Sequence, residues 1–165
     1  MSTALQRTLQ QIKTENKDFF RIAISVDCVI LGFEEHTLKV LLIQSDLKEY
    51  NDLYSLPGDL VKPTEDLDTA PYRVLKERTG LSNVYLEQVY TFGDVRRHPA
   101  GRVITTAYYS LLNIKDHDLH LSNKYGTPPQ WVPVYEIKKL AFDHKKILDT
   151  CIEPVSYTHL RAHET

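Results

Sequence analysis

The residues best suited to chemistry lie in one segment, LPGDLVKPTEDLDTAPYRVLKERTGL, between Leu56 and Leu81. Charged side chains recur there at helical spacing, at Arg73, Glu77 and Arg78. Side chains three and four residues apart share one face of a helix, and carboxylates on such a face can hold a magnesium ion and a phosphate group. The segment therefore suggests a helix that binds metal and phosphate, provided that the face carries enough carboxylates.

The helix itself is predicted from Asp68 to Thr79, with Asp66 or Asp68 as its N-cap. Pro71 favours the later start, because proline is tolerated in the first turn, where its missing N–H costs nothing. Gly80 fits the position just after the helix. The expected buried stripe consists of Leu67, Ala70, Val74 and Leu75.

A second candidate site is a loop that holds Arg96, Arg97 and Arg102. Forked guanidinium donors suit phosphate or carboxylate recognition, although a solvated basic loop explains the same pattern. Asp27, within an apolar strand, is a candidate polar contact to a ligand. Tyr108 is a candidate for stacking on a base or sugar, with a place in the core as the alternative. The seven histidines show no metal-ligand spacing.

These residues need a scaffold, and the chain offers six strand-like segments and several short helices. Strands are predicted at 21–33, 38–45, 54–56, 84–92, 103–114 and 130–133, and short helices at 2–15, 134–140 and 144–151. This order predicts an α+β fold, an α/β/α sandwich with a mixed sheet between helices. We expect an amphipathic helix in residues 1–19, one domain in 20–154, and a non-native tail in 155–165, where VSYTHLRAHET has no periodicity or cap signal.

Composition excludes several classes of function. The formal charge of -2 gives no global attraction to nucleic acid or to an anionic membrane. The longest apolar runs are far too short to span a bilayer, so no membrane partner is expected. The two cysteines lie far apart, and Cys28 stands in an apolar run, as a buried reduced thiol would. This pattern is typical of a cytoplasmic protein without a disulfide framework.

The segment resembles the Nudix box: Gly, five residues, Glu, seven residues, then Arg-Glu-aliphatic-any-Glu-Glu-any-Gly-aliphatic. Glu65, Arg73, Leu75, Glu77 and the pair Gly80-Leu81 fall on the pattern, and Leu56-Pro57-Gly58 matches the usual lead-in. Three positions depart from it: Asp59 replaces Gly, Val74 replaces Glu, and Arg78 replaces Glu. The resemblance implies that Gly58, Glu65, Arg73, Glu77 and Gly80 keep a structural role.

The departures matter because positions 74, 77 and 78 carry the three metal-binding carboxylates of the working family. Val74, Glu77 and Arg78 bring no net negative charge, and a guanidinium about 4 Å from a cation reverses an interaction of about 4 kcal/mol at an effective dielectric of 20. We therefore expect no catalytic residue, no metal and no cofactor. For Arg78, contact with a ligand phosphate is the alternative to a solvated residue at the helix end.

Beyond the box, the segments SVDCVILGF, RHPAGRVITTAYYSLL and LAFDHKKIL resemble the Nudix-related transcriptional regulators. In these proteins a Nudix-like domain senses a nucleotide such as ADP-ribose, a sugar or a sugar phosphate, and a C-terminal winged-helix domain binds DNA. The resemblance implies a homodimeric, non-hydrolytic sensor with its ligand between helix and sheet, and with DNA bound only through a winged helix absent here.

Two alternatives remain open. The first is an active Nudix hydrolase that cleaves a diphosphate linkage with Mg²⁺, in which Glu77, Glu65 and Asp59 rebuild a metal site. The second is a structural or dimerisation module.

Overall fold

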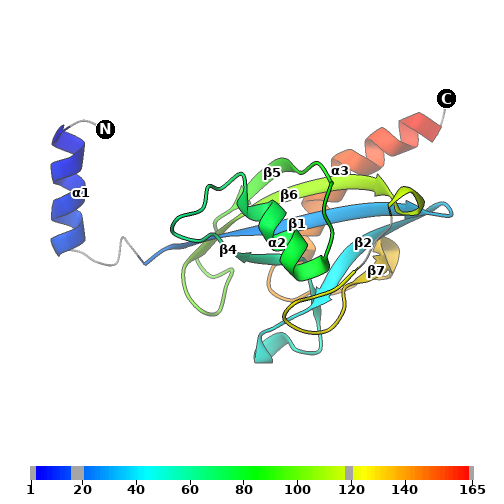
Figure 1. The fold of residues 1–165 in the computed structure, drawn as a ribbon, viewed down its shortest axis with the longest axis horizontal. Helices are drawn as coiled ribbons and strands as arrows, with labels where there is room; N and C mark the ends of the chain where they lie inside the picture. The colour runs from blue at the N-terminus through cyan, green and yellow to red at the C-terminus, as the bar shows by residue number, and fades with distance from the viewer. Residues whose placement is uncertain (1–2, 16–20, 118–120, 164–165) are drawn as a thin grey trace.

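The computed structural model describes residues 3–15, 21–117 and 121–163, and the side chains of residues 3, 8, 12–15 and 154–163 lie outside the description. Figure 1 shows the arrangement of its helices and strands. The helices and 3-10 turns are α1 (Thr3–Glu15), η2 (Lys48–Tyr50), α2 (Ala70–Thr79), η3 (Ile114–Asp116), η4 (Val134–Glu136) and α3 (His144–His163). The strands are β1 (Ala23–Glu34), β2 (Thr37–Gln44), β3 (Tyr54–Ser55), β4 (Gly58–Leu60), β5 (Glu87–Phe92), β6 (Val103–Asn113) and β7 (Gln130–Pro133).

The strands form one mixed seven-stranded sheet with the main order β3-β2-β1-β6-β5. β1 and β6 are parallel, whereas β2 and β5 run antiparallel to their neighbours β1 and β6. Two strands share one edge of β1: β4 pairs with residues 25–27, and β2 pairs with residues 31–34.

Helices cover both faces of the sheet, as the alternation of side chains along β1 shows. Val26, Cys28 and Ile30 pack in one buried cluster with Val74 and Leu75 of α2. The intervening residues of β1 pack in a second cluster with α3; this group is Val29, Leu31, Ile147, Leu148 and Cys151. Successive residues of a strand point to opposite faces, so α2 and α3 lie on opposite sides of the sheet. The predicted α/β/α sandwich is confirmed (Figure 1).

The predicted strands are all present, with one addition and shorter ends. β4 was not predicted, because Pro57-Gly58 reads as a break, yet Gly58–Leu60 pairs with β1. Val134–Leu140, predicted as a helix, is only the 3-10 turn η4. The helix predicted at 144–151 is α3, which continues to His163 through most of the segment 155–165. Leu67, placed in the buried stripe, is 37% exposed.

The predicted N-terminal helix is present as α1, which lies apart from the sheet in Figure 1. Its Leu5 and Leu9 are 48% and 37% exposed. Cys28 and Cys151 are both buried and form no disulfide. Among the described residues, no helix is long and apolar enough to cross a membrane.

Candidate ligand-binding site

The site is organised by α2, which begins at Ala70 and ends at Thr79. Thr69 is the N-cap and makes no side-chain cap hydrogen bond, so the predicted caps Asp66 and Asp68 were wrong. Pro71 lies in the first turn, as predicted. Gly80 adopts a left-handed φ of 76° and donates its N–H to the carbonyl of Lys76 at 2.9 Å, which ends the helix.

The segment after residue 120 holds the C-terminal end of α2. The backbone N–H of Ser122 donates to the carbonyl of Thr79, and that of Lys124 donates to the carbonyl of Glu77, both at 3.1 Å. These contacts satisfy carbonyls that the end of a helix leaves without partners. They also hold Tyr125 above the last turn of α2.

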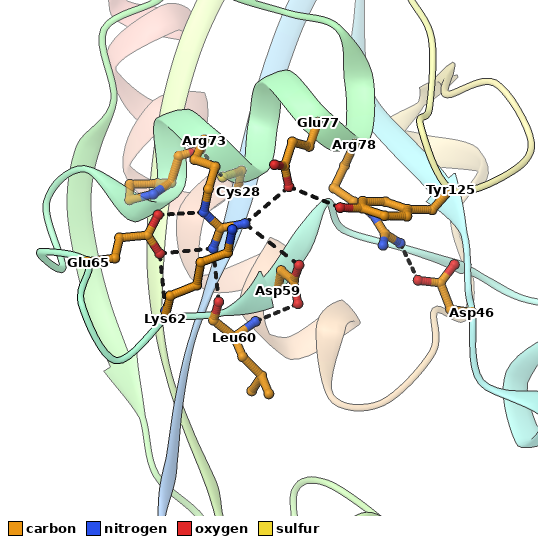
Figure 2. Close-up of polar contacts among 11 residues, drawn as sticks. Cys28, Asp46, Asp59, Leu60, Lys62, Glu65, Arg73, Glu77, Arg78 and Tyr125 are labelled. Atoms are coloured by element: carbon orange, nitrogen blue, oxygen red, sulfur yellow. Dashed lines mark hydrogen bonds and ion pairs between the residues drawn. The ribbon is translucent and has the colours of Figure 1, made fainter.

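Arg73 is the centre of the polar network on α2 (Figure 2). Its Nε and Nη2 donate to the two carboxylate oxygens of Glu65, the second at 2.9 Å. Its Nη1 donates to Glu77 at 3.1 Å, and its Nη2 also donates to the carbonyl of Leu60 at 3.0 Å. Asp59 completes the group with a carboxylate oxygen 3.8 Å from Nη1. One guanidinium therefore ties the loop before the helix and strand β4 to α2.

The ionisation of this network follows from its hydrogen bonds. The hydrogen bond from Arg73 lowers the pKa of Glu65 below its usual value, and the backbone N–H of Lys62, 3.2 Å away, adds to that effect. The same pairing raises the pKa of Arg73. Glu65, Arg73 and Glu77 thus form the ionic scaffold that the box resemblance implies.

The three positions that carry metal ligands in a complete box face different surroundings. Val74 is fully buried in the core beneath α2. Glu77 is engaged by Arg73 and accepts a hydrogen bond from the Tyr125 hydroxyl at 3.3 Å. Arg78 is 7% exposed and points toward Asp46 (Figure 2).

This donor set does not fit a magnesium ion. Mg²⁺ requires near-octahedral oxygen ligation, and here an alkyl group and a guanidinium stand at two of the three positions. The remaining carboxylate, Glu77, is paired with Arg73. Within the described part of the chain, no group of three or more histidine, cysteine, aspartate or glutamate side chains is placed to hold a metal ion.

Arg78 is held by two residues that sequence reasoning did not single out. Its Nη2 donates to Asp46 at 2.5 Å, and its guanidinium carbon lies 5.3 Å from the centre of the Tyr125 ring. Its Nε is buried and has no hydrogen-bond partner among the described residues. A buried donor without a partner is costly, so the protein contacts of Arg78 do not by themselves account for its burial.

Beside Arg78 lies a cavity of about 250 Å³. Its polar and aromatic lining consists of Ser25, Asp27, Ser45, Asp46, Ser55, Asp59, Arg78, Arg97, His98, Phe142 and His144, and Gly58 also lines it. Asp27 lies on the same face of β1 as Val29 and Leu31, against which α3 packs. Asp27 therefore places part of the cavity lining on the α3 face of the sheet, while Arg78 lines the cavity from the last turn of α2. The expected ligand position between helix and sheet stays a prediction.

The floor of the cavity is a buried polar cluster around Asp27, which is 4% exposed. Its carboxylate accepts from the Thr105 hydroxyl at 2.6 Å and lies 3.3 Å from Nε2 of His144. The N–H of Leu56 donates to Nδ1 of His144 at 3.0 Å. Burial lowers the pKa of His144, so the imidazole is neutral near neutral pH.

The structure separates the three arginines of the predicted phosphate-binding loop. Arg97 is buried and donates two hydrogen bonds to Asp143, at 3.0 and 2.9 Å, and one to the carbonyl of Val103. Arg102 donates to the carbonyl of Gly93. Arg96 is exposed. Of the three, Arg97 alone lines the cavity, and its guanidinium is engaged by protein oxygens.

Of the two strand residues, Asp27 lines the cavity and Tyr108 does not. Tyr108 packs on the opposite face of the sheet, in the core beneath α2, with its hydroxyl 3.4 Å from Asp68. Burial and that contact raise its pKa. The core alternative for Tyr108 is therefore the one that the structure favours.

Sequence reasoning missed His98, Phe142 and His144 as cavity residues. The imidazole of His98 stacks on the Phe142 ring, with centroids 4.8 Å apart and planes 17° apart. Phe142 adopts a left-handed φ of 56°, an unusual conformation for a bulky residue that often marks functional sites. Phe142 and His144 lie in the segment LAFDHKKIL, but the spacing of residues in this segment does not predict a pocket.

Comparison with known proteins supplies a family. The NUDIX domain model matches residues 21–151. The chain is 31% identical over 138 residues to the ADPR responsive transcriptional repressor NtrR of Acinetobacter baylyi, covering 81% of this chain and 54% of that protein. It is 26% identical over 137 residues to the ADP-ribose pyrophosphatase of Methanocaldococcus jannaschii, covering 83% and 79% of the two chains. The chain thus spans about half the length of the first relative.

The fold also matches a solved structure, the NUDIX domain of Shewanella oneidensis NrtR complexed with ADP ribose. The TM-score is 0.76 and the identity 25%, and the match covers 94% of this chain and 99% of that one.

Proposed function

The chain belongs to the NUDIX domain family, and from this premise we propose that it is the effector-sensing domain of a transcriptional regulator that binds ADP-ribose, or a related sugar phosphate, without hydrolysing it. The ligand would occupy the cavity beside Arg78. In this proposal no metal or other cofactor takes part.

One observation carries the proposal: a guanidinium stands where the family pattern has a metal-binding carboxylate. Arg78 lines the cavity, is almost fully buried, and holds an Nε without a partner among the described residues. A guanidinium donates to phosphate oxygens directly and needs no bridging cation. An intrinsic positive charge at position 78 would thus bind the diphosphate that a metal ion would otherwise bridge.

The choice of ligand rests on the relatives. The Acinetobacter relative is named as ADPR responsive, and the Shewanella NUDIX domain was crystallised with ADP ribose. Shewanella NrtR was also crystallised with a 27mer DNA, and this chain covers 62% of that longer chain. We propose that DNA binding resides in a C-terminal winged-helix region of the same kind.

Three further parts of the proposal concern assembly, location and additional contacts to the ligand. We propose that the domain works as a homodimer, with the exposed leucines of α1 docked on a second copy, because an isolated helix of this length is marginal in water. The two free buried thiols favour the cytoplasm as its location. Arg96 and Arg102 remain candidates for contacts to parts of the ligand outside the cavity.

The direct test is titration calorimetry of ADP-ribose with EDTA present, together with the ligand-induced shift in melting temperature. Arg78→Gln should weaken binding about tenfold or more, since it removes a charge-assisted contact, while Lys76→Ala on the exposed face of α2 should bind as wild type. Binding that requires Mg²⁺, or that survives Arg78→Gln unchanged, would contradict the proposal.

An active hydrolase is the second candidate, favoured by the match to the Methanocaldococcus pyrophosphatase and by the carboxylates Asp59, Glu65 and Glu77 around Arg73. Release of AMP from ADP-ribose with Mg²⁺, measured for wild type and Glu77→Gln, separates the two. Turnover abolished by Glu77→Gln would favour the hydrolase over the sensor.

A further inference from the structure

The floor of the cavity contains a carboxylate whose hydrogen-bonding capacity is only partly used. Asp27 accepts a hydrogen bond from Thr105 and lies 3.3 Å from Nε2 of His144, whereas an ionised carboxylate has about four acceptor sites. A side chain on Gly58 would overlap one carboxylate oxygen, with an added Cβ only 2.1 Å from Oδ1. Oδ1 of Asp27 therefore occupies the place that a side chain at position 58 would take, and both residues line the cavity.

The surrounding residues fix Asp27 as an acceptor. Because the N–H of Leu56 donates to Nδ1 of His144, the proton of the neutral ring is on Nε2, which faces Asp27. His144 thus supplies a donor and cannot take a proton from Asp27 at that atom. Thr105 approaches from within the sheet and is fully buried.

The negative charge of Asp27 is only partly balanced by the charged groups around it. Arg97 is the positive group nearest to it, yet its fork is engaged with Asp143, and its closest approach to Asp27 is 4.0 Å. Two carboxylates therefore share one guanidinium, and the imidazole is neutral. A ligand that presents hydrogen-bond donors to Asp27 would stabilise this buried negative charge, whereas a phosphate placed there would be repelled.

Arg78, which lines the same cavity, has the reverse preference. The Arg78 side chain is 8% exposed, and its Nε lacks a partner among the described residues. Asp46, its one carboxylate partner, is 55% exposed on the loop after β2. The cavity lining thus presents a guanidinium at Arg78 and a carboxylate at Asp27, and its volume of about 250 Å³ lies just below the usual range of ligand pockets, so it would enclose about one sugar phosphate.

We propose that Asp27, held by Thr105 and His144, is a specificity-determining residue that accepts hydrogen bonds from the hydroxyl groups of the terminal sugar, while Arg78 binds the adjacent phosphate. The inference rests on the proposed ligand class and adds which end of the ligand is enclosed: the terminal sugar lies inside, and the adenine lies outside. His144 is a positioning residue in this scheme.

The experiment compares ADP-ribose with ADP, which lacks the terminal sugar, by titration calorimetry on wild type, Asp27→Asn and the control Asp149→Asn, an exposed position on α3. The Asp27→Asn substitution keeps the size of the side chain and removes its charge. We expect wild type to bind ADP-ribose at least about tenfold more tightly than ADP, and Asp27→Asn to lose most of that preference with little change toward ADP. The Asp149→Asn variant should keep the wild-type preference.

Equal affinities of wild type for ADP-ribose and ADP would overturn the inference. This comparison needs only the wild-type protein, so it can be made even if Asp27→Asn fails to fold. Equal weakening toward both ligands in Asp27→Asn, or no change toward either, would overturn it as well. Ribose 5-phosphate separates the two proposals. If ribose 5-phosphate binds and its binding depends on Asp27, while ADP-ribose does not bind, the proposed role of Asp27 is supported and the assignment of ADP-ribose as the ligand is wrong. If ADP-ribose binds wild type and Asp27→Asn with equal affinity, the assignment of ADP-ribose as the ligand is supported and the proposed role of Asp27 is wrong.

Discussion

Gly58 and Asp27 are paired residues of β4 and β1, and the carboxylate of Asp27 fills the space that a side chain at 58 would need. A Cβ at Gly58 would lie 2.1 Å from Oδ1 of Asp27 and 2.9 Å from the carbonyl oxygen of Val26. The first contact could be relieved by moving a side chain, but the second is with backbone. The glycine before the box pattern thus has a steric reason to be glycine.

Gly58→Ala should therefore destabilise the fold by about 1–3 kcal/mol, as overpacking does, and should displace Asp27. Urea denaturation measures the free energy of unfolding. The control is Gly126→Ala, where an added Cβ meets nothing within 4 Å, with an expected change below about 0.5 kcal/mol. Equal effects of the two substitutions would contradict the steric account.

Arg73→Ala should cost about 2 kcal/mol of unfolding free energy, because it leaves Glu65 and the carbonyl of Leu60 without their donor. The expected loss is no larger because the Arg73 side chain is 18% exposed and solvent screens part of the charge. Arg73→Lys should recover less than half of the loss, since an ammonium cannot reproduce the fork. Lys76→Ala on the same helix is the control, and a full rescue by lysine would refute the geometric argument.

The stability of the fold should depend on pH through His144. Burial lowers the pKa of His144 from its ordinary 6.5, so the unfolded chain takes up a proton there before the folded protein does. The free energy of unfolding should consequently fall as pH drops below about 6.5. His144→Asn should be less stable at pH 7.5 but should show a smaller decrease between about pH 7.5 and 5.5. His98, whose pKa is also lowered by burial, should account for part of the remaining slope.

Tyr125 should contribute to stability mainly through its ring. Tyr125→Ala removes the face that covers Arg78, 5.3 Å from the ring centre, and should cost about 0.5–1 kcal/mol at this half-exposed site. Tyr125→Phe keeps the ring and loses only the 3.3 Å hydrogen bond to Glu77, so its cost should be smaller. Melting temperatures of both variants test this ranking of the two costs. A larger decrease in melting temperature for Tyr125→Phe than for Tyr125→Ala would contradict it.

The two thiols should be unreactive in the native protein. Burial raises the pKa of Cys28 strongly and that of Cys151 to about 12, so neither has appreciable thiolate at neutral pH. Ellman's reagent should titrate neither cysteine in buffer and both in guanidinium chloride. Rapid labelling in buffer would show that α3 or the sheet opens readily.

The local parts of the structure followed from the sequence because short-range rules govern them. Gly80 ended α2 as predicted, and the ion pair of Arg73 with Glu77 follows from their spacing of four residues. The buried Val74 was likewise read as core. The N-cap and the short strand β4 were not predicted correctly from the sequence. Thr69 is the N-cap but makes no side-chain hydrogen bond there, and β4 is a strand only because it pairs with β1.

The cavity was less accessible to sequence reasoning, because its walls come from distant segments. Asp46 meets Arg78 across 32 residues, and the N–H of Leu56 reaches His144 across 88. The three loop arginines formed a cluster in the sequence, yet the fold directs Arg97 inward to Asp143 and leaves Arg96 exposed. No periodicity encodes such choices.

Residue type and spacing along one element were enough to identify the family, the helix α2 and the loss of two carboxylates from its face. What Arg78 does in their place depends on the tertiary structure. Its guanidinium lines the cavity, lies over the Tyr125 ring and pairs with Asp46. Burial and long-range pairing are properties of the packed chain, and they turn a substituted box position into a buried positive charge in the same cavity as Asp27.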